Sequence, residues 1–382
     1  MKIGLFTECY KPVINGVVHS IMNTKEGLEE LGHEVYIFSP DYGRKNVREK
    51  NLIHCPSAPL PGKTGYHYIF KLPKKVTDIA EALDIVHTHH PFTMGRYASE
   101  IAKANSIPLL FTHHTQYDQY TRYVPIVRKR AKRFLYGFLK NFCNKCDLII
   151  APSSSIQRVI KSYGTQTPIQ VVPNGIDITR FQEIKDLSTP RILSGLKPNY
   201  KIIIYTGRVA YEKNIDFIVK AFKIALTEYP EAYLLIVGPG PALGSLIKLS
   251  ARIGLTGNII FTGEVPYNQI RNYYHAADFF MTASKTEVHP LVILEALAAG
   301  LPVVAIDAIG TSDIITQNKT GYLTRENLDE FAKKIVYLLK NPVRLNIMSR
   351  NAIRKSNDYS IPTTAKKMVE AYKKAQTLLS KK

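Results

Sequence analysis

The sequence predicts an α/β protein that contains two doubly wound parallel sheets. Short runs of β-branched residues alternate with amphipathic stretches along nearly the whole chain, a pattern typical of parallel strands joined by crossover helices. Turn residues gather between Pro173 and Tyr200 and interrupt this alternation once, as a linker does. The chain has 382 residues, more than a single hydrophobic core usually stabilises, so we expect two domains.

Two series of strands are predicted, one on each side of the linker. The first series occupies residues 2–6, 34–38, 84–87, 108–112, 147–151 and 169–172. The second occupies residues 201–206, 233–237, 258–261, 278–281 and 302–305. Beyond Asn341 the sequence predicts only helix, and Pro362 suits the start of the last one. We therefore expect a first domain over residues 1–185, a second over 186–357 and a terminal helix over 358–382.

The net charge is strongly positive. There are 51 Lys and Arg residues against 31 Asp and Glu residues, which gives a net charge of +20. This balance favours an anionic partner, and nucleic acid, an anionic membrane surface and a diphosphate substrate all satisfy it. No apolar run approaches the roughly 18 residues needed to cross a bilayer, and the N-terminus lacks the layout of a signal peptide. We therefore expect a cytoplasmic protein.

The cysteines predict neither disulfides nor a metal centre. The chain has 4 cysteines, too few for a disulfide scaffold at this length. Cys143 and Cys146 have CxxC spacing, but no second pair accompanies them and they fall within a helical pattern. We expect all of them to be thiols.

Two strand-to-helix loops carry residues suited to a phosphate. Sheets of this class bind ligands beyond the carboxyl ends of their strands. Gly16 opens the helix after the first strand, where backbone N–H groups and the helix dipole favour an anion. Arg208 and Lys213 follow strand 201–206, and both side chains can donate charge-assisted hydrogen bonds to a diphosphate. A tight Asn15-Gly16 turn and a solvated basic loop are the alternative interpretations.

The most specific pattern is a pair of glutamates around a proline. Glu287 and Glu295 flank Pro290, which suits the first position of a helix. The intervening residues, as helix, would span about 12 Å, comparable with the distance from a nucleotide ribose to its attached hexose. Because carboxylates accept hydrogen bonds from sugar hydroxyls, this pair can hold both ends of a sugar nucleotide. The alternative is a capping acid and an unrelated surface acid.

These motifs together resemble glycosyltransferase family four, the retaining GT-B enzymes. The resemblance covers nearly the whole chain and rests on Asn15-Gly16-Val17, Gly207-Arg208, Lys213-Asn214, Glu287 to Glu295 and Gly300-Leu-Pro302-Val-Val304. It implies two Rossmann-like domains that face each other across a cleft, with the C-terminal helix returning to the first domain. It also implies a nucleotide sugar held mainly by the second domain, an acceptor at the first, and transfer with retention at the anomeric carbon.

The resemblance also implies a role for each phosphate-site and glutamate residue. Gly16 would contact the diphosphate through its backbone N–H. Arg208 and Lys213 would neutralise the diphosphate as it departs, an electrostatic task. Glu287 would contact the transferred sugar, and Glu295 would bind the ribose hydroxyls.

Three further positions follow from the same resemblance. Val265 stands where the backbone of the family commonly meets the base, Leu291 stands among the donor contacts, and His114 stands where a histidine lies near the sugar. The family often has glycine where Pro290 stands, and proline has no N–H to offer the donor. The contacts from residues 288–291, and with them the choice of sugar, are therefore left open.

Histidines gather at two neighbouring strand ends, but we expect no metal there. The group consists of His87, His89, His90, His113 and His114. No carboxylate or cysteine accompanies them at a recognisable ligand spacing. The chain also has no Asp-x-Asp, the metal-holding pair of the other major transferase fold. We expect metal-independent catalysis with a nucleotide sugar, of UDP-hexose type, as co-substrate and no other cofactor.

The placement of the positive charges bears on the acceptor. Residues 122–146 include eight Lys and Arg residues and no acid, and apolar residues recur there at helical spacing. A helix over 126–145 can lie on an anionic bilayer, or its apolar stripe can face the protein core. The segment 59–71, which has aromatic residues beside lysines, also favours membrane contact.

The sequence therefore predicts transfer of a hexose from a UDP-sugar to a membrane lipid. His87-Thr-His89-His90-Pro-Phe92 and Thr112-His-His114-Thr115-Gln-Tyr117 are most similar to the family branch that glycosylates diacylglycerol. We expect peripheral association with the inner face of the membrane and no nucleic-acid partner, and the oligomeric state is left open. A soluble sugar, inositol phosphate or glycan acceptor is the alternative, and a non-enzymatic nucleic-acid-binding protein is the distant one.

Overall fold

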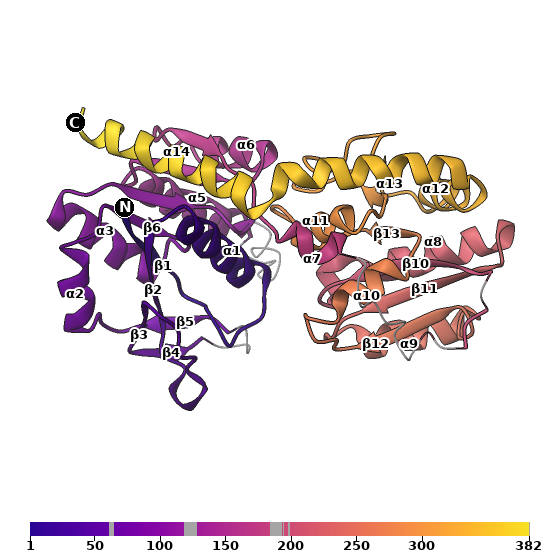
Figure 1. Ribbon diagram of the computed structural model, residues 1–382. Helices are drawn as coiled ribbons and strands as arrows, with labels where there is room; N and C mark the ends of the chain where they lie inside the picture. Colours follow the sequence, from indigo (N-terminus) through magenta and orange to yellow (C-terminus); the bar gives the residue numbers. More distant parts are fainter. Residues whose placement is uncertain (61–64, 118–127, 184–192, 194, 198, 382) are drawn as a thin grey trace. The chain divides into compact units, whose positions relative to one another are not determined.

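The computed structural model divides into two compact units, each built on its own parallel sheet (Figure 1). It describes residues 1–60, 65–117, 128–183, 193, 195–197 and 199–381. Unit 1 comprises Met1–Ile176 and Ile361–Lys382, and unit 2 comprises Asp177–Ser360. The predicted domain boundary at 185/186 lies outside the described residues.

Unit 1 contains a seven-stranded sheet in the order β3-β2-β1-β6-β7-β8-β9, in which every pair is parallel. Its strands are β1 (Lys2–Phe6), β2 (Glu34–Pro40), β3 (Leu52–Cys55), β6 (Ile85–Thr88), β7 (Leu109–Thr112), β8 (Leu148–Ala151) and β9 (Ile169–Val171). A separate antiparallel pair is formed by β4 (Ser57–Pro59) and β5 (His67–Ile69). The strand order reverses between β1 and β6, which is where sheets of this class bind ligands.

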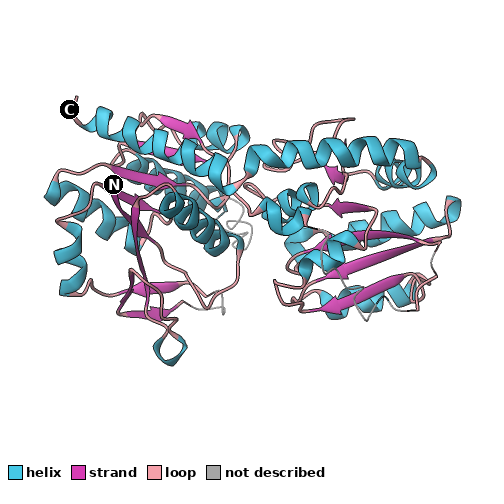
Figure 2. Ribbon diagram, viewed as in Figure 1, coloured by secondary structure: helices cyan, strands magenta, loops and turns pink. Residues whose placement is uncertain are grey.

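Helices flank this sheet (Figure 2). They are α1 (Gly16–Glu30), α2 (Lys74–Ala80), α3 (Thr93–Asn105), α5 (Arg128–Cys143), α6 (Ser154–Ser162) and α14 (Ile361–Leu379), with a 3₁₀ turn η1 (Gly43–Lys45). Asn15 starts α1 because its side-chain oxygen accepts a hydrogen bond from the backbone N–H of Val18 at 2.9 Å.

The last helix, α14, completes the core of unit 1. Figure 1 shows α14 in yellow beside α1 in indigo. The two helices pack closely because Gly27 has no side chain, and a Cβ there would lie 2.7 Å from both Ala365 and Ile361. Tyr372 of α14 is fully buried in the same apolar cluster as Leu5 of β1. The far end of the sequence thus belongs to the first structural unit.

Unit 2 contains a six-stranded parallel sheet in the order β12-β11-β10-β13-β14-β15. Its strands are β10 (Lys201–Thr206), β11 (Ala232–Val237), β12 (Ile259–Gly263), β13 (Phe279–Thr282), β14 (Val303–Ile306) and β15 (Gly321–Thr324). Its helices are α7 (Ile178–Gln182), α8 (Ile215–Glu228), α9 (Leu243–Arg252), α10 (Ile270–His275), α11 (Leu291–Ala298), α12 (Leu328–Lys340) and α13 (Pro342–Ser356). The described residues of the unit also include the 3₁₀ turns η5 (Tyr211–Lys213) and η6 (Asn357–Tyr359).

The observed topology confirms the predicted fold class, including the return of the last helix to the first unit. Every predicted strand is present, but β3, β4, β5 and β15 were not predicted. β15 begins with Gly321, a residue depleted in strands. Glycine is required there because a Cβ would collide with the backbone oxygen of Val303 on β14.

The basic helix predicted over 126–145 is α5, and residues 126–127 lie outside the described part. Its apolar stripe divides between two faces. Leu139 and Phe142 are buried against the core, whereas Phe134 is 80% exposed. Phe134 lines a shallow depression whose other lining residues are Arg130, Arg133, Gly137, Phe138 and Asn141. One face of α5 thus packs inward, while the other presents an aromatic ring among cations.

The thiol prediction for the cysteines agrees with the structure, in which all four are buried and none is in a disulfide. Cys143 ends α5, and Cys146 lies after the turn that follows it. Burial raises the pKa of the Cys143 thiol to about 12. Among the residues that the structure describes, no helix is both long and apolar enough to span a bilayer.

Candidate active site

The predicted phosphate and sugar residues of unit 2 gather at the carboxyl edge of its sheet. β10 and β13 are parallel neighbours, so the loops that follow them leave the sheet at the same edge. Arg208 and Lys213 lie after β10, and Glu287 lies after β13. Gly207 adopts a φ of 126°, a conformation that favours glycine, and it turns the chain at the end of β10.

Lys213 and Glu287 form an ion pair. Nζ of Lys213 lies 2.6 Å from Oε1 of Glu287, and the two side chains are 23% and 19% exposed. Burial would raise the pKa of the Glu287 carboxyl, but the Lys213 ammonium outweighs it, and the pKa lies below its ordinary value. Glu287 is therefore ionised at neutral pH and available to accept hydrogen bonds.

Arg208 is held differently from Lys213. Its side chain is 67% exposed, and Nη1 lies 3.7 Å from Oε1 of Glu212 in the next turn. Its backbone oxygen accepts a hydrogen bond from the hydroxyl of Tyr205 at 3.1 Å. The guanidinium thus stays at the surface of unit 2, where an incoming anion can reach it.

Glu295 lies in α11 and is only 6% exposed. Its two oxygens accept hydrogen bonds from the hydroxyls of Tyr274, at 2.9 Å, and Tyr267, at 3.1 Å. The Tyr274 hydroxyl also lies 2.6 Å from Oγ1 of Thr206, the last residue of β10. Burial raises the pKa of the Glu295 carboxyl even though both tyrosines lower it. Through Tyr274, this carboxyl is linked to the end of β10, the strand that the predicted phosphate residues follow.

The prediction that Pro290 occupies the first helical position is wrong. Pro290 is the N-cap residue of α11, with a ψ of 116°, and Leu291 is the first helical residue. Only the part from Leu291 to Glu295 is helical, so the helical rise does not apply to the whole interval from Glu287. Val265 lies half-buried in the loop between β12 and α10.

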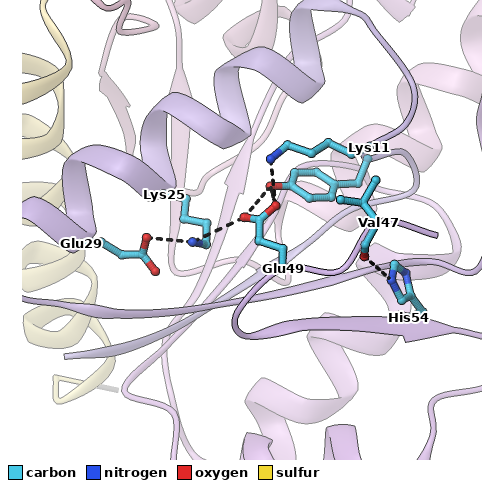
Figure 3. A network of polar contacts seen from close by, with 7 residues as sticks. Lys11, Lys25, Glu29, Val47, Glu49 and His54 are labelled. Atoms are coloured by element: carbon cyan, nitrogen blue, oxygen red, sulfur yellow. Dashed lines mark hydrogen bonds and ion pairs between the residues drawn. The ribbon is translucent and has the colours of Figure 1, made fainter.

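In unit 1, Gly16 is the first residue of α1, and a Cβ built there would meet nothing within 4 Å. Its backbone is therefore open to approach. The loop before it is held by Glu49, which accepts hydrogen bonds from Lys11 at 2.8 Å and from the Tyr10 hydroxyl at 3.3 Å (Figure 3). Lys25 of α1 lies 3.5 Å from the same carboxylate. These contacts fix the loop that leads to the start of α1.

His114 follows β7, and its ring lies beside that of His89, which follows β6. Nδ1 of His89 is 2.8 Å from Nε2 of His114. His89 is 1% exposed, whereas His114 is half-buried. Burial, together with the neighbouring imidazoles, lowers the pKa of both rings well below the ordinary value, so both are neutral at pH 7.

The other clustered histidines are held by hydroxyl groups. His87 lies between Thr112, at 2.6 Å, and Tyr372 of α14, at 2.9 Å. His113 lies 3.0 Å from the hydroxyl of Tyr163. Within the described ranges, no group of three or more His, Cys, Asp or Glu residues has an arrangement that could hold a metal.

Glu8 lies at the same edge of the unit 1 sheet as His89 and His114, and it was not predicted as a site residue. It follows β1, is 2% exposed, and accepts hydrogen bonds at 2.9 Å from the Thr93 hydroxyl and the Met94 N–H at the start of α3. Burial raises the pKa of its carboxyl to about 7. An acid directly after an apolar strand was the available signal. No sequence signal pointed to Tyr267 or Tyr274 as partners of Glu295, and His89 was predicted only as a member of the histidine cluster.

Comparison with known proteins places both units in one enzyme class. Residues 14–180 match the model described as Glycosyltransferase Family 4, and residues 191–355 match Glycosyl transferases group 1. The chain is 31% identical to alpha-monoglucosyldiacylglycerol synthase of Acholeplasma laidlawii, over 97% of this chain and 96% of that protein. It is 32% identical to the synthase of that name from Streptococcus pneumoniae, over 85% of this chain and 75% of the other.

Solved structures show the same fold at lower identity. Anabaena HepE, solved with UDP, is similar with a TM-score of 0.79 and 19% identity, over 98% of this chain and 100% of the other. Sucrose-phosphate synthase of Thermosynechococcus elongatus has a TM-score of 0.77 and 18% identity, with 100% of both chains covered. The motifs, the two parallel sheets and the relatives agree, and the chain belongs to glycosyltransferase family four, with the GT-B fold.

Proposed function

We propose that this glycosyltransferase moves glucose from UDP-glucose to diacylglycerol at a membrane surface, with retention of the anomeric configuration. The observation that carries the proposal is the likeness, over nearly the whole chain, to an enzyme named for making alpha-monoglucosyldiacylglycerol. The sugar in UDP-glucose is α-linked, so an α-linked product corresponds to retention. No metal or organic cofactor takes part in the reaction as proposed.

The donor is bound by unit 2. Lys213 and Arg208 offer cationic donors for the diphosphate, and the buried Glu295 offers acceptors for the ribose hydroxyls. Glu287, ionised beside Lys213, accepts hydrogen bonds from the hexose. Val265 and Leu291 border the base and the donor, and Gly16 of unit 1 offers its N–H to the diphosphate.

Transfer proceeds by attack on the face that the leaving group vacates. The bond from the anomeric carbon to the diphosphate oxygen breaks first, and the developing negative charge is stabilised by Lys213 and Arg208. The acceptor hydroxyl then bonds to the anomeric carbon from the same face. Its proton passes to the departing phosphate oxygen, so the step needs no protein nucleophile. His114 donates or accepts a hydrogen bond at the sugar, which keeps the hexose oriented.

The acceptor is reached from the membrane through α5. Phe134 is 80% exposed on a helix that carries Arg130, Lys132, Arg133 and Lys140, all of them exposed. An aromatic ring surrounded by cations suits the interface of an anionic bilayer. A second segment also presents aromatic rings to solvent: Tyr68 lies in β5, Phe70 follows it, and both are about half exposed. We propose a peripheral enzyme at the inner face of the membrane.

The decisive experiment offers the purified protein several donors and acceptors. UDP-glucose, UDP-galactose, UDP-N-acetylglucosamine and GDP-mannose, each radiolabelled in the sugar, are supplied with mixed vesicles that contain diacylglycerol and an anionic phospholipid. We expect label from UDP-glucose in the lipid phase and an α-anomeric proton in the product by NMR. A soluble sugar, an inositol phosphate and a glycan are supplied in parallel. If label appears only on one of these, the lipid proposal is wrong and that compound is the acceptor.

A further inference from the structure

The imidazole pair at the ends of β6 and β7 constrains the hydrogen-bonding role of His114. The ring planes of His89 and His114 differ by 22°, their centroids are 5.1 Å apart, and Nδ1 of His89 is 2.8 Å from Nε2 of His114. Nearly coplanar rings joined edge to edge place an N–H of one in line with a lone pair of the other. The short distance therefore marks a hydrogen bond between two nitrogen atoms.

A hydrogen bond between two neutral imidazoles fixes their tautomers together. Each neutral ring carries one proton, on either Nδ1 or Nε2. If His89 donates from Nδ1, then Nε2 of His114 is the acceptor and His114 carries its own proton on Nδ1. If His114 donates from Nε2 instead, its Nδ1 is a bare acceptor, and His89 must carry its proton on Nε2.

The surroundings of His89 decide between the two arrangements. Nε2 of His89 is buried and has no hydrogen-bond partner in the part of the chain that the structure describes. A buried N–H without a partner is rarer and costlier than a buried lone pair without one. The arrangement in which His89 donates from Nδ1 leaves only a lone pair at that position, so it is favoured.

His89 in turn packs against the ring of His87. The ring of His87 lies 4.5 Å from that of His89, centroid to centroid, with 32° between the planes. His87 is itself fixed between Thr112 and Tyr372, so the pair rests on an anchored ring. His89 is only 1% exposed, so it can act on a ligand only through His114.

We propose that His89 is a positioning residue that donates its Nδ1–H to Nε2 of His114 and thereby presents His114 as an Nδ1–H donor. This rests on the proposed function only in taking the ligand of His114 to be the hexose. The hydroxyl that His114 contacts must then accept a hydrogen bond. This tautomer is the less common one of free histidine, so a specific neighbour is needed to hold it.

The test reads the tautomer directly in the substrate-free protein. Long-range ¹H–¹⁵N correlation spectra of ¹⁵N-histidine-labelled protein report which ring nitrogen carries the proton, and His114→Gln assigns the signals. We expect His114 to be protonated at Nδ1 in the parent protein and in His89→Asn, whose amide N–H can replace Nδ1–H. In His89→Leu we expect His114 to return to the Nε2-protonated form. An Nε2-protonated His114 in the parent would overturn the proposal, and His114→Gln is the one variant that this assignment requires.

Kinetics provide the second readout. We expect His89→Leu to lower kcat/KM by about 10- to 100-fold, as losing a partner that orients a functional ring does. His89→Asn should restore most of it. Tyr163→Phe, which removes the hydroxyl beside the neighbouring buried His113, is the matched control and should keep the parent rate. A rate in His89→Leu equal to that of the parent would also overturn the proposal.

The two proposals fail in different ways. Release of nucleotide from the donor measures turnover whatever the acceptor is. A protein that shows the expected tautomer but glucosylates no diacylglycerol contradicts the proposed acceptor alone.

Discussion

Nζ of Lys213 lies 2.6 Å from Oε1 of Glu287, so the cation that we propose for the diphosphate is held by the acid that we propose for the sugar. Each side chain is about one-fifth exposed. The ammonium and the carboxylate therefore neutralise each other until a sugar nucleotide competes for them. This coupling makes the two residues inseparable in any mutational test.

Lys213→Met should lower both stability and turnover. Loss of the ammonium leaves the ionised Glu287 uncompensated. We expect this to lower the free energy of unfolding by about 1–3 kcal/mol at pH 7, less than for a fully buried pair because both side chains are partly exposed. Without the ammonium, charge stabilisation of the leaving group is lost, and kcat/KM should fall by about 100-fold or more. Urea unfolding and donor turnover measure the two effects, and Lys213→Arg serves as the charge-conserving control.

The stability difference between the parent and Lys213→Met should depend on pH. The pKa of Glu287 is lowered in the folded parent, so its contribution is present above the ordinary carboxyl pKa and is lost as the pH falls through the folded value. The two unfolding curves should therefore converge in acid. A difference that is the same at acidic and neutral pH would show that the loss is one of packing.

Glu8→Gln should stabilise the protein, and the gain should grow as the pH rises. The carboxyl pKa rises from an ordinary 4.5 to about 7 in the folded state, so its stability contribution is complete below pH 4.5 and is lost as the pH rises to about 7. The glutamine oxygen can still accept from Thr93 and Met94. We expect a gain on the order of 3 kcal/mol at pH 8 and little at pH 4, measured by urea unfolding.

Tyr267→Phe should weaken donor binding more than it weakens the fold. The hydroxyl holds one oxygen of Glu295 at 3.1 Å, and the Arg180 guanidinium lies 4.3 Å from the centre of the Tyr267 ring, so the ring keeps its support in the variant. Loss of one hydrogen bond to the carboxylate should raise the donor Kd by about tenfold. Calorimetric titration with UDP measures this, and an unchanged Kd would mean that Glu295 is oriented by Tyr274 alone.

Phe134→Ser should weaken vesicle binding and leave the fold intact. The side chain is 80% exposed, so its removal costs the fold little, whereas its insertion into a bilayer buries apolar area. We expect about tenfold weaker binding to anionic vesicles. Val343→Ser is the matched control because Val343 is 73% exposed on α13 of unit 2. If both variants lose the same amount of vesicle affinity, α5 is not the part of the protein that contacts the membrane.

The sequence allowed the central strands to be predicted because buried parallel strands are continuous β-branched runs, as at Lys201–Thr206. The edge strands β3 and β15, which were not predicted, are short and carry no such run, and β15 begins with glycine. The loop residues Arg208, Lys213 and Glu287 could be placed at one edge because parallel topology brings strand ends together. Their roles in the reaction stay predictions.

The partners of the site residues could not be predicted. The two tyrosines on Glu295 lie 21 and 28 positions away from it, and they reach it from α10 and from the loop before α10. His89 and His114 are 25 positions apart and meet because β6 and β7 are neighbours. The sequence predicted that these strand ends are neighbours, but not that the two rings contact each other. Side-chain partners across a fold follow from tertiary packing, which local patterns do not encode.

The dependence of unit 1 on α14 has a consequence for how the chain folds during synthesis. When the ribosome has made residues 1–176, the sheet of unit 1 is complete, but the place of Met368, Ala371 and Tyr372 in its core is empty. An apolar face of the sheet then stays open while the whole of unit 2 is made. The nascent first unit therefore needs protection from aggregation until the final helix arrives, and a chain cut short before Ile361 should accumulate as a chaperone client.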